Sequence, residues 1–140
     1  MIINFKGLQP QYMSLGAAGA DLASKDSHTI LPNEQVMIDT GTAVAIPEGY
    51  FGMCCPRSSL CNKGGLRLVN SVGIIDHDYR GTMRFVYENV SSSPVEISKG
   101  ERIGQLVILP FVQAEFTQVE DLDETERGEG GFGSTGKGEV

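Results

Sequence analysis

Residues 70–81 read NSVGIIDHDYRG and combine a strand-like half with a polar half. Asn70–Ile75 alternates small and aliphatic residues with a spacing of two, which is typical of a β-strand. The polar half follows with Asp76, Asp78, Tyr79, Arg80 and Gly81. A carboxylate at the end of a buried strand suits a general base if it is partly desolvated. Taken alone, the same residues favour a tight turn, because Asp and Gly are common turn formers.

The size and composition of the chain predict one all-β domain. The chain has 140 residues, including 18 glycines and 6 prolines, and it has no tryptophan. This length suits a single core. The frequent glycine and proline indicate many short strands joined by turns, and no window has the apolar spacing of a long helix.

The formal net charge of −7 is unevenly distributed along the chain. Residues 1–114 carry 10 acidic and 9 basic side chains, whereas residues 115–140 carry 8 acidic and 2 basic ones. A chain without a basic stripe is not expected to bind a nucleic acid polymer, although a small anionic ligand is compatible with it. We expect a core domain at 1–114 and an acidic linker with a mobile arm at 115–140.

Cysteine usage and hydropathy predict a soluble, cytoplasmic protein. Cys54, Cys55 and Cys61 cannot pair completely and two of them are adjacent, which favours a reducing compartment and buried thiols. A zinc site is disfavoured because no matching ligand set accompanies them. We expect His28 and His77 to be solvated. The chain shows no signal-peptide pattern and no run of about 20 apolar residues, so we expect no membrane association.

Alternation and turn residues predict further strands along the chain. They are expected at 2–6, at 35–47 with a break at Thr40 and Gly41, at 50–55, 66–69, 82–90 and 94–97, and within KGERIGQLVILP at 99–110. Met83, Phe85 and Tyr87 are expected on the buried face of 82–90. In the last strand Ile103 and residues 106–109 are expected in the core, so that Gln105 needs a hydrogen-bond partner there.

Two short stretches allow both a structural and a functional interpretation. GAAGADLAS at 16–24 is typical of a packed turn capped by Asp21. PRSSL at 56–60 places Arg57 and the hydroxyls of Ser58 and Ser59 at the start of a short helix. That group suits an anion, although the serines are equally typical of ordinary helix capping.

Five motifs in chain order resemble the signature motifs of the dUTP pyrophosphatase (dUTPase) family. They are AGADL at 18–22, PRSSL at 56–60, NSVGIIDHDYRG at 70–81, RIGQ at 102–105 and RGEGGFGSTGKG at 127–138. Gly104 departs mildly from the family pattern, in which alanine is more usual. The resemblance implies a distorted jelly-roll β-barrel with one short helix and a flexible glycine-rich C-terminal arm. It also implies a homotrimer whose active sites are shared between subunits.

The resemblance implies a reaction and a role for each matching residue. The reaction is hydrolysis of dUTP to dUMP and pyrophosphate with Mg²⁺, which limits uracil incorporation into DNA and supplies dUMP for thymidylate synthesis. Asp76 is the implied base that activates water, and Asp21 contacts the metal through water. The implied substrate-binding residues are Arg57, Ser58, Ser59, Arg102 and Gln105 at the phosphates, Asn70 and Ile75 in a β-hairpin that reads uracil, and Tyr79 against the deoxyribose.

The C-terminal stretch gains a function only through the same resemblance. Its composition alone indicates a flexible tail. In the family this arm closes over the nucleotide, which implies that Phe132 stacks on uracil and that Arg127, Ser134 and Thr135 meet the phosphates. Gly133 would then allow close approach of the backbone.

Three alternative functions are compared with this one. A P-loop ATPase does not fit GFGSTGKG, because Gly138 replaces the final Ser or Thr and no helix follows before Val140. The dCTP deaminases share the implied fold, but their catalytic glutamate would fall at Val86. A regulatory protein that senses a nucleotide and binds a protein partner stays open as a second role, with the acidic linker as its contact surface.

Overall fold

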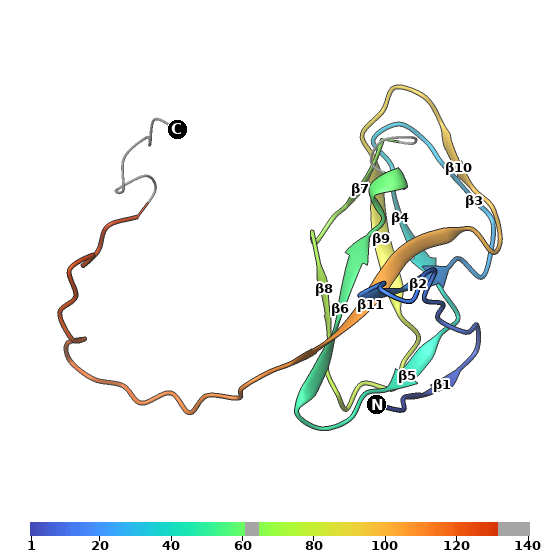
Figure 1. Ribbon diagram of the computed structural model, residues 1–140. Coiled ribbons are helices and arrows are strands. Elements are labelled where there is room, and N and C mark those ends of the chain that lie inside the picture. Colours follow the sequence, from blue (N-terminus) through green and yellow to red (C-terminus); the bar gives the residue numbers. More distant parts are fainter. Residues whose placement is uncertain (61–64, 132–140) are drawn as a thin grey trace.

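The computed structural model describes residues 1–60 and 65–131, and this part of the chain is almost entirely β-structure (Figure 1). Residues 58–60 form one short helical turn. The strands are β1 Asn4–Lys6, β2 Gly19–Ala23, β3 His28–Ile30, β4 Gln35–Asp39, β5 Ala43–Ala45, β6 Tyr50–Pro56, β7 Leu66–Leu68, β8 Gly73–Ile75, β9 Arg84–Asn89, β10 Val95–Ile97 and β11 Arg102–Pro110. None of the described residues belongs to a helix with the length and hydropathy of a membrane span.

The strands form two larger sheets and two small ones, and every pair is antiparallel. The larger sheets have the orders β2-β11-β6-β8 and β4-β9-β7, and the small ones are β1-β5 and β10-β3. The last strand, β11, lies between β2 and β6, so segments distant in the chain become neighbours. This is the predicted jelly-roll β-barrel, and it brings the motif near the N-terminus beside the motif at 102–105.

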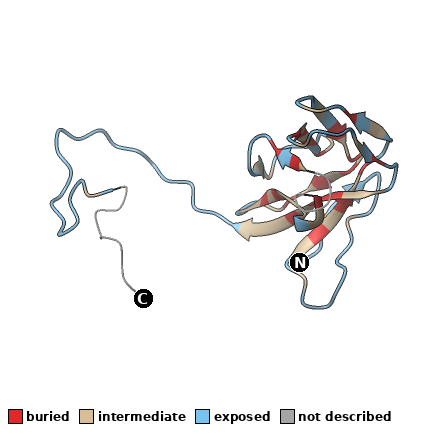
Figure 2. Ribbon diagram, turned by 90° about the horizontal axis from the view of Figure 1, so that it is seen from above, coloured by how far each residue is buried: buried red, intermediate tan, exposed pale blue. Residues whose placement is uncertain are grey.

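The core lies between the two larger sheets. Figure 2 shows the buried residues gathered in the part of the chain formed by strands β1 to β11, which we term the β-body. Met83, Phe85 and Tyr87 are each at most 1% exposed, as their alternation predicts. The hydroxyl of Tyr87 donates to the carbonyl oxygen of Ile103 at 2.5 Å, which links β9 to β11. Burying these three side chains fixes which face of β9 points inward.

The break predicted between two strands at Thr40 and Gly41 is confirmed by the end of β4 and the start of β5. Thr40 Oγ1 donates to the carbonyl oxygen of Met83 at 2.8 Å, which satisfies a buried hydroxyl. Gly41 has a φ of 66°, a conformation that glycine adopts at little cost. A buried hydrogen bond and a left-handed residue therefore interrupt the strand.

Three local predictions were wrong. Residues 19–23 form the strand β2 in place of a packed turn, because β11 supplies a ladder partner that no local pattern reveals. The expected β-hairpin at 70–75 is a tight turn followed by the short strand β8. In the described residues β7 pairs with β9 and β8 pairs with β6. Finally, Val107 and Leu109 are half-buried and are not part of the core, because β11 runs toward the edge of the sheet, whereas Ile108 is half-buried and packs against the core.

The histidines and cysteines differ in part from expectation. His28 was expected to be solvated, but its Nε2 atom is buried without a hydrogen-bond partner in the described residues, because β3 pairs with β10 around it. Cys54 is buried and Cys55 is half-buried, and both are free thiols. Burial, with a smaller contribution from the neighbouring Cys55, raises the pKa of Cys54 to about 12. Cys61 lies outside the described residues.

After β11 ends at Pro110, the chain leaves the β-body and runs outward (Figure 1). Residues 111–131 contain no strand, and large apolar side chains on this segment are exposed, with Val112 at 90% and Phe116 at 94%. The boundary at residue 114 between core and arm stays a prediction.

Candidate active site

Residues distant in the chain meet where β2, β11 and β6 lie side by side. Asp21 in β2 pairs with Gln105 in β11, and Arg102 begins β11. Arg57 and Ser58 follow directly after β6, which lies on the other side of β11. Residues in one row across a sheet point to the same face. The strand register therefore places Asp21 beside Gln105, and the neighbouring ends of β6 and β11 bring Arg57, Ser58 and Arg102 close to them.

These five residues line an open cavity of about 400 Å³, which we term the Asp21 pocket. All of them were singled out from the sequence, on three separate motifs. Ser58 is exposed, whereas Ser59 is half-buried and is not among the residues that line the cavity. The structure thus brings together Asp21, Arg57, Ser58, Arg102 and Gln105.

Two arginines hold the carboxylate of Asp21. Arg102 Nη1 donates to Asp21 Oδ2 at 3.0 Å, and Arg57 Nε lies 3.3 Å from the same oxygen. Arg57 Nη1 also donates to the carbonyl oxygen of Arg102 at 3.3 Å. The side chain of Asp21 is only 11% exposed. Because two guanidinium groups share one carboxylate, the pocket keeps a net positive charge and attracts an anion.

Gln105 extends its amide into space that Gly19 leaves open. A Cβ atom on Gly19 would lie 2.3 Å from Gln105 Oε1, so a larger residue at 19 would displace the amide. Gln105 Nε2 donates to the carbonyl oxygen of Pro56 at 3.4 Å, which is at the long end of the hydrogen-bond range. The expected partner of Gln105 therefore exists but is weak, and the amide stays available to a ligand.

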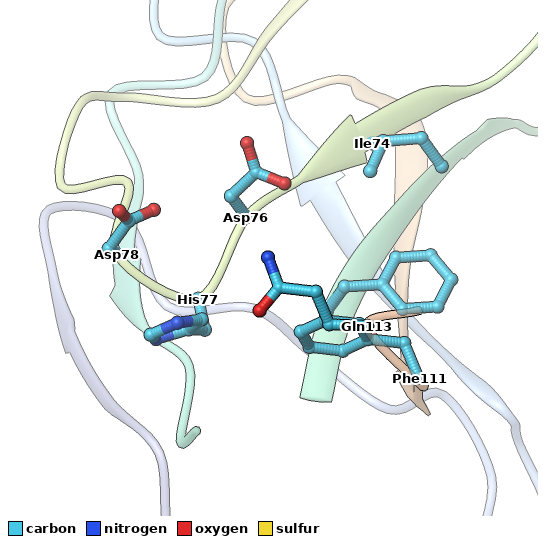
Figure 3. Close-up of a pocket in the computed structure, with 7 residues that line it drawn as sticks. Ile74, Asp76, His77, Asp78, Phe111 and Gln113 are labelled. Atoms are coloured by element: carbon cyan, nitrogen blue, oxygen red, sulfur yellow. The ribbon is translucent and has the colours of Figure 1, made fainter. Parts of the chain in front are cut away.

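A second cavity of about 500 Å³, which we term the Asp76 pocket, lies beyond the end of β8 (Figure 3). Asp76, His77 and Asp78 form its polar side. Its aromatic side consists of Phe51 and Phe111, whose rings meet edge to face with centroids 6.3 Å apart. One wall is thus apolar and the other can accept hydrogen bonds.

Phe51, Phe111 and Gln113 line the Asp76 pocket, although no motif in the sequence points to them. Phe51 in β6 pairs with Leu109 in β11, and the backbone N–H of Phe111 donates to the carbonyl oxygen of Gly49. The end of β11 therefore carries Phe111 to Phe51. The only signal in the sequence was one aromatic residue near the start of β6 and another just after the end of β11. This signal becomes informative only when β6 and β11 are known to pair.

Asp76 begins a tight turn, so the structural interpretation of this stretch also holds. The backbone N–H of Tyr79 donates to the carbonyl oxygen of Asp76 at 3.1 Å. Arg80 Nη1 donates to the carbonyl oxygens of His77 at 2.6 Å and Tyr79 at 3.0 Å. Arg80 thus holds the backbone of the turn, and it makes no ion pair with Asp78 in the described residues.

The single chain does not provide the desolvation expected around Asp76. Asp76 is exposed, because the turn at 76–79 lies at the surface of the β-body. Asn70 is also exposed, Ile75 is half-buried, and Tyr79 is 44% exposed. The described part of this chain therefore leaves Asp76 open to solvent.

The two pockets belong to opposite edges of the same sheet. In the order β2-β11-β6-β8, three strand spacings separate β2 from β8. Asp21 lies in the row of Gln105, and Ile75, just before Asp76, lies in the row of Gly52 and Ile108. Standard strand spacing and rise then place Asp76 roughly 20 Å from Asp21. One chain therefore does not bring Asp76 to the Asp21 pocket.

A family model described as dUTPase matches residues 6–136. The chain belongs to the dUTPase family. Two curated relatives are named deoxyuridine 5'-triphosphate nucleotidohydrolase. The one from Cutibacterium acnes is 48% identical over 128 residues, which cover 91% of this chain and 84% of the relative. The one from Nautilia profundicola is 48% identical over 135 residues, which cover 96% of this chain and 95% of the relative.

A solved structure of another dUTPase has the same fold as this chain. The dUTPase of Staphylococcus bacteriophage 80alpha, solved with dUPNHPP, is 31% identical and superposes with a TM-score of 0.90. The match covers 97% of this chain and 99% of the phage protein. The predicted family and the predicted jelly-roll fold are therefore confirmed.

The C-terminal arm of this dUTPase is described only as far as residue 131. Arg127 is exposed, and its Nε donates to the carbonyl oxygen of Gly130 at 2.9 Å, within a local turn. Phe132, Gly133, Ser134 and Thr135 lie outside the described residues. Their roles stay predictions.

Few side chains in the described part of this dUTPase could contact a metal ion. The described residues contain no group of three His, Cys, Asp or Glu side chains placed to hold a metal ion. Asp21 is a single carboxylate, and both of its ion pairs use Oδ2, which leaves Oδ1 for a water molecule. Magnesium keeps several waters and is often bound through one or two carboxylates and substrate phosphates. The donor set therefore fits a magnesium ion carried by a triphosphate and contacted by Asp21 through water.

Proposed function

We propose that the chain hydrolyses dUTP to dUMP and pyrophosphate by magnesium-dependent attack of water on the α-phosphorus. In a cell this reaction would limit uracil incorporation into DNA and supply dUMP for thymidylate synthesis. The observation that carries the proposal is the Asp21 pocket, in which residues of three dUTPase motifs converge around a shared carboxylate. Residues 81 positions apart meet there by direct hydrogen bonding.

The Asp21 pocket is the proposed site of the phosphate chain. Arg57 and Ser58 would bind phosphate oxygens near the bond that breaks, and Gln105 would add an amide hydrogen bond. Arg102 would support this site by holding the carboxylate of Asp21, to which its Nη1 donates at 3.0 Å. When bound, Mg²⁺ would neutralise charge on the triphosphate, and Asp21 would contact it through water. Fixed positive groups around a triphosphate lower the cost of placing charge on the leaving pyrophosphate.

Asp76 is the proposed general base, and its position supports a homotrimer with shared active sites. Its carboxylate is exposed in one chain and lies roughly 20 Å from Asp21 by strand geometry. A neighbouring subunit that placed its own Asp21 pocket beside Asp76 would remove this separation. It would also cover Asp76 from solvent, which raises the basicity of a carboxylate. Water held by Asp76 would then attack the α-phosphorus in line.

The base and the sugar would be read near the turn at 70–79. Backbone groups around Ile75 would pair with the uracil edge, with Asn70 adding an amide, because uracil offers two acceptors flanking one donor. Tyr79 would pack against the deoxyribose. From the arm, Phe132 and Gly133 would cover the uracil, while Arg127, Ser134 and Thr135 would meet the phosphates.

A second, regulatory role with a protein partner stays a prediction, as do the cytoplasmic location and solubility of the protein. The exposed apolar and acidic side chains of the segment after β11 are compatible with a partner. A pulldown of partners with and without dUTP would test that role apart from catalysis.

The proposed function is tested by measuring pyrophosphate release from dUTP, dCTP, dTTP and UTP with magnesium and with a chelator. Selective conversion of dUTP to dUMP, lost with the chelator, is the expected result. Release of ammonia from dCTP would favour a deaminase. Tight binding of dUTP without turnover of any nucleotide would contradict the enzyme and favour a sensor.

A further inference from the structure

We propose that Gly81 is a positioning residue for sugar selectivity. Because it has no side chain, the ring of Tyr79 can fold back against the backbone at 81–82, and this sets where the ring meets the sugar. The inference rests on the proposed function, in which Tyr79 packs against the deoxyribose.

The space beside Gly81 is filled by the Tyr79 ring. A Cβ atom on Gly81 would lie 2.3 Å from Tyr79 Oη, 2.5 Å from Cζ and 3.0 Å from Cε2. Gly81 is not among the glycines with positive φ, so its backbone would accept any residue. The ring itself is therefore what requires glycine at this position.

Hydrogen bonds hold the ring and its turn in place. Tyr79 Oη donates to the carbonyl oxygen of Thr82 at 3.1 Å, and the Tyr79 N–H donates to the carbonyl oxygen of Asp76. Arg80 holds the carbonyl oxygens on either side of Asp78. The Tyr79 ring is therefore fixed to the same short turn that carries Asp76.

The Tyr79 hydroxyl is used inside the turn, so the ring offers the sugar an apolar surface. Recognition of the 2' position then depends on shape, and an apolar surface rejects an added hydroxyl by about 10²-fold at most. Such selectivity is sensitive to where the surface lies. A phenol ring is rigid, so a new Cβ at position 81 must move the whole ring and break the Thr82 hydrogen bond.

The test compares kcat and KM for dUTP and UTP in the wild type, Gly81→Ala and Gly16→Ala. Gly16 is the matched control, because its φ is not positive and a Cβ atom there would meet nothing within 4 Å. Both substrates are measured on one preparation, so the fraction of folded enzyme cancels in the ratio of their kcat/KM values. A merely structural role of Gly81 would therefore leave this ratio unchanged.

In Gly81→Ala we expect the preference for dUTP over UTP to fall about tenfold, chiefly through KM, and we expect no change in Gly16→Ala. A ratio within twofold of the wild type would overturn the inference. If Gly81→Ala does not fold, Tyr79→Phe decides, because it removes the bond to Thr82 and keeps the ring. A lower ratio supports the inference, and an unchanged ratio overturns it.

The same data separate this inference from the proposed function. A wild type that hydrolyses dUTP selectively, together with an unchanged ratio in Gly81→Ala, would overturn only the role of Gly81. A wild type that does not turn over dUTP would overturn both.

Discussion

The ring of Phe85 occupies the space in which a side chain of Gly104 would begin. A Cβ atom on Gly104 would lie 2.2 Å from Phe85 Cζ and 2.4 Å from Cε1. Phe85 is buried in β9 and stacks on Tyr87 with ring centroids 6.0 Å apart, so it has little room to move. This packing explains why glycine stands where the family motif more usually has alanine.

Gly104→Ala should therefore destabilise the protein by overpacking. We expect the free energy of unfolding to fall by about 1–3 kcal/mol, measured by urea denaturation. Phe85→Leu combined with Gly104→Ala should cost less than the two single changes added together, because the smaller side chain makes room. Equal stability of Gly104→Ala and the wild type would show that Phe85 does not require glycine.

Asp76→Asn should abolish dUTP turnover and keep nucleotide binding. Asparagine has nearly the same shape but cannot accept a proton from water, and the Tyr79 bond to residue 76 uses only the backbone carbonyl. We expect a loss of at least about 10²-fold in kcat with an unchanged Kd for a non-hydrolysable dUTP analogue. Normal turnover would remove Asp76 from its role as the base.

Deletion of residues 127–140 should preserve the fold and cripple catalysis. The described contacts of Arg127 stay within the arm, and the strands end at Pro110, so the β-body loses no contact that the structure describes. The circular dichroism spectrum and the urea midpoint should match those of the full chain, while kcat/KM for dUTP collapses. An unfolded product would contradict the assignment of the arm as a lid.

Asp39 should make a small, pH-dependent contribution to stability. Burial tends to raise its pKa, but the N–H of Gly41, the Thr82 hydroxyl and Lys25 together hold the pKa below its usual 3.8. Because the folded chain binds this proton less tightly, the contribution is complete above about pH 3.8 and is lost as the pH falls through the lower, folded value.

Urea unfolding of Asp39→Asn tests this contribution. We expect a loss of up to about 1 kcal/mol at about pH 7, and a difference from the wild type that shrinks as the pH is lowered through the folded pKa of Asp39. Asp26→Asn is the control, since Asp26 is an exposed acid whose side chain makes no ion pair in the described residues. A difference that stays constant with pH would show that Asp39 acts through packing alone.

Local patterns were sufficient for much of the fold and for part of the site. The alternation at 82–90 identified Met83, Phe85 and Tyr87 as core, because burial on one side of a strand imposes a spacing of two. Five residues predicted from motifs line the Asp21 pocket together. The small residues at 16–24 predict a packed turn, but residues 19–23 form a strand because β11 provides the ladder.

Residue types and their spacing along the chain are enough to predict the family, the strand-rich architecture and the identity of the polar residues. The folded chain is needed to show that Asp21 lies between Arg57 and Arg102, and that Phe111 closes a pocket against Phe51. It is also needed to show that Asp76 lies at the opposite edge of the sheet from Asp21. Such relationships depend on which strands pair and in what register, and that choice is made by the packing of the whole core.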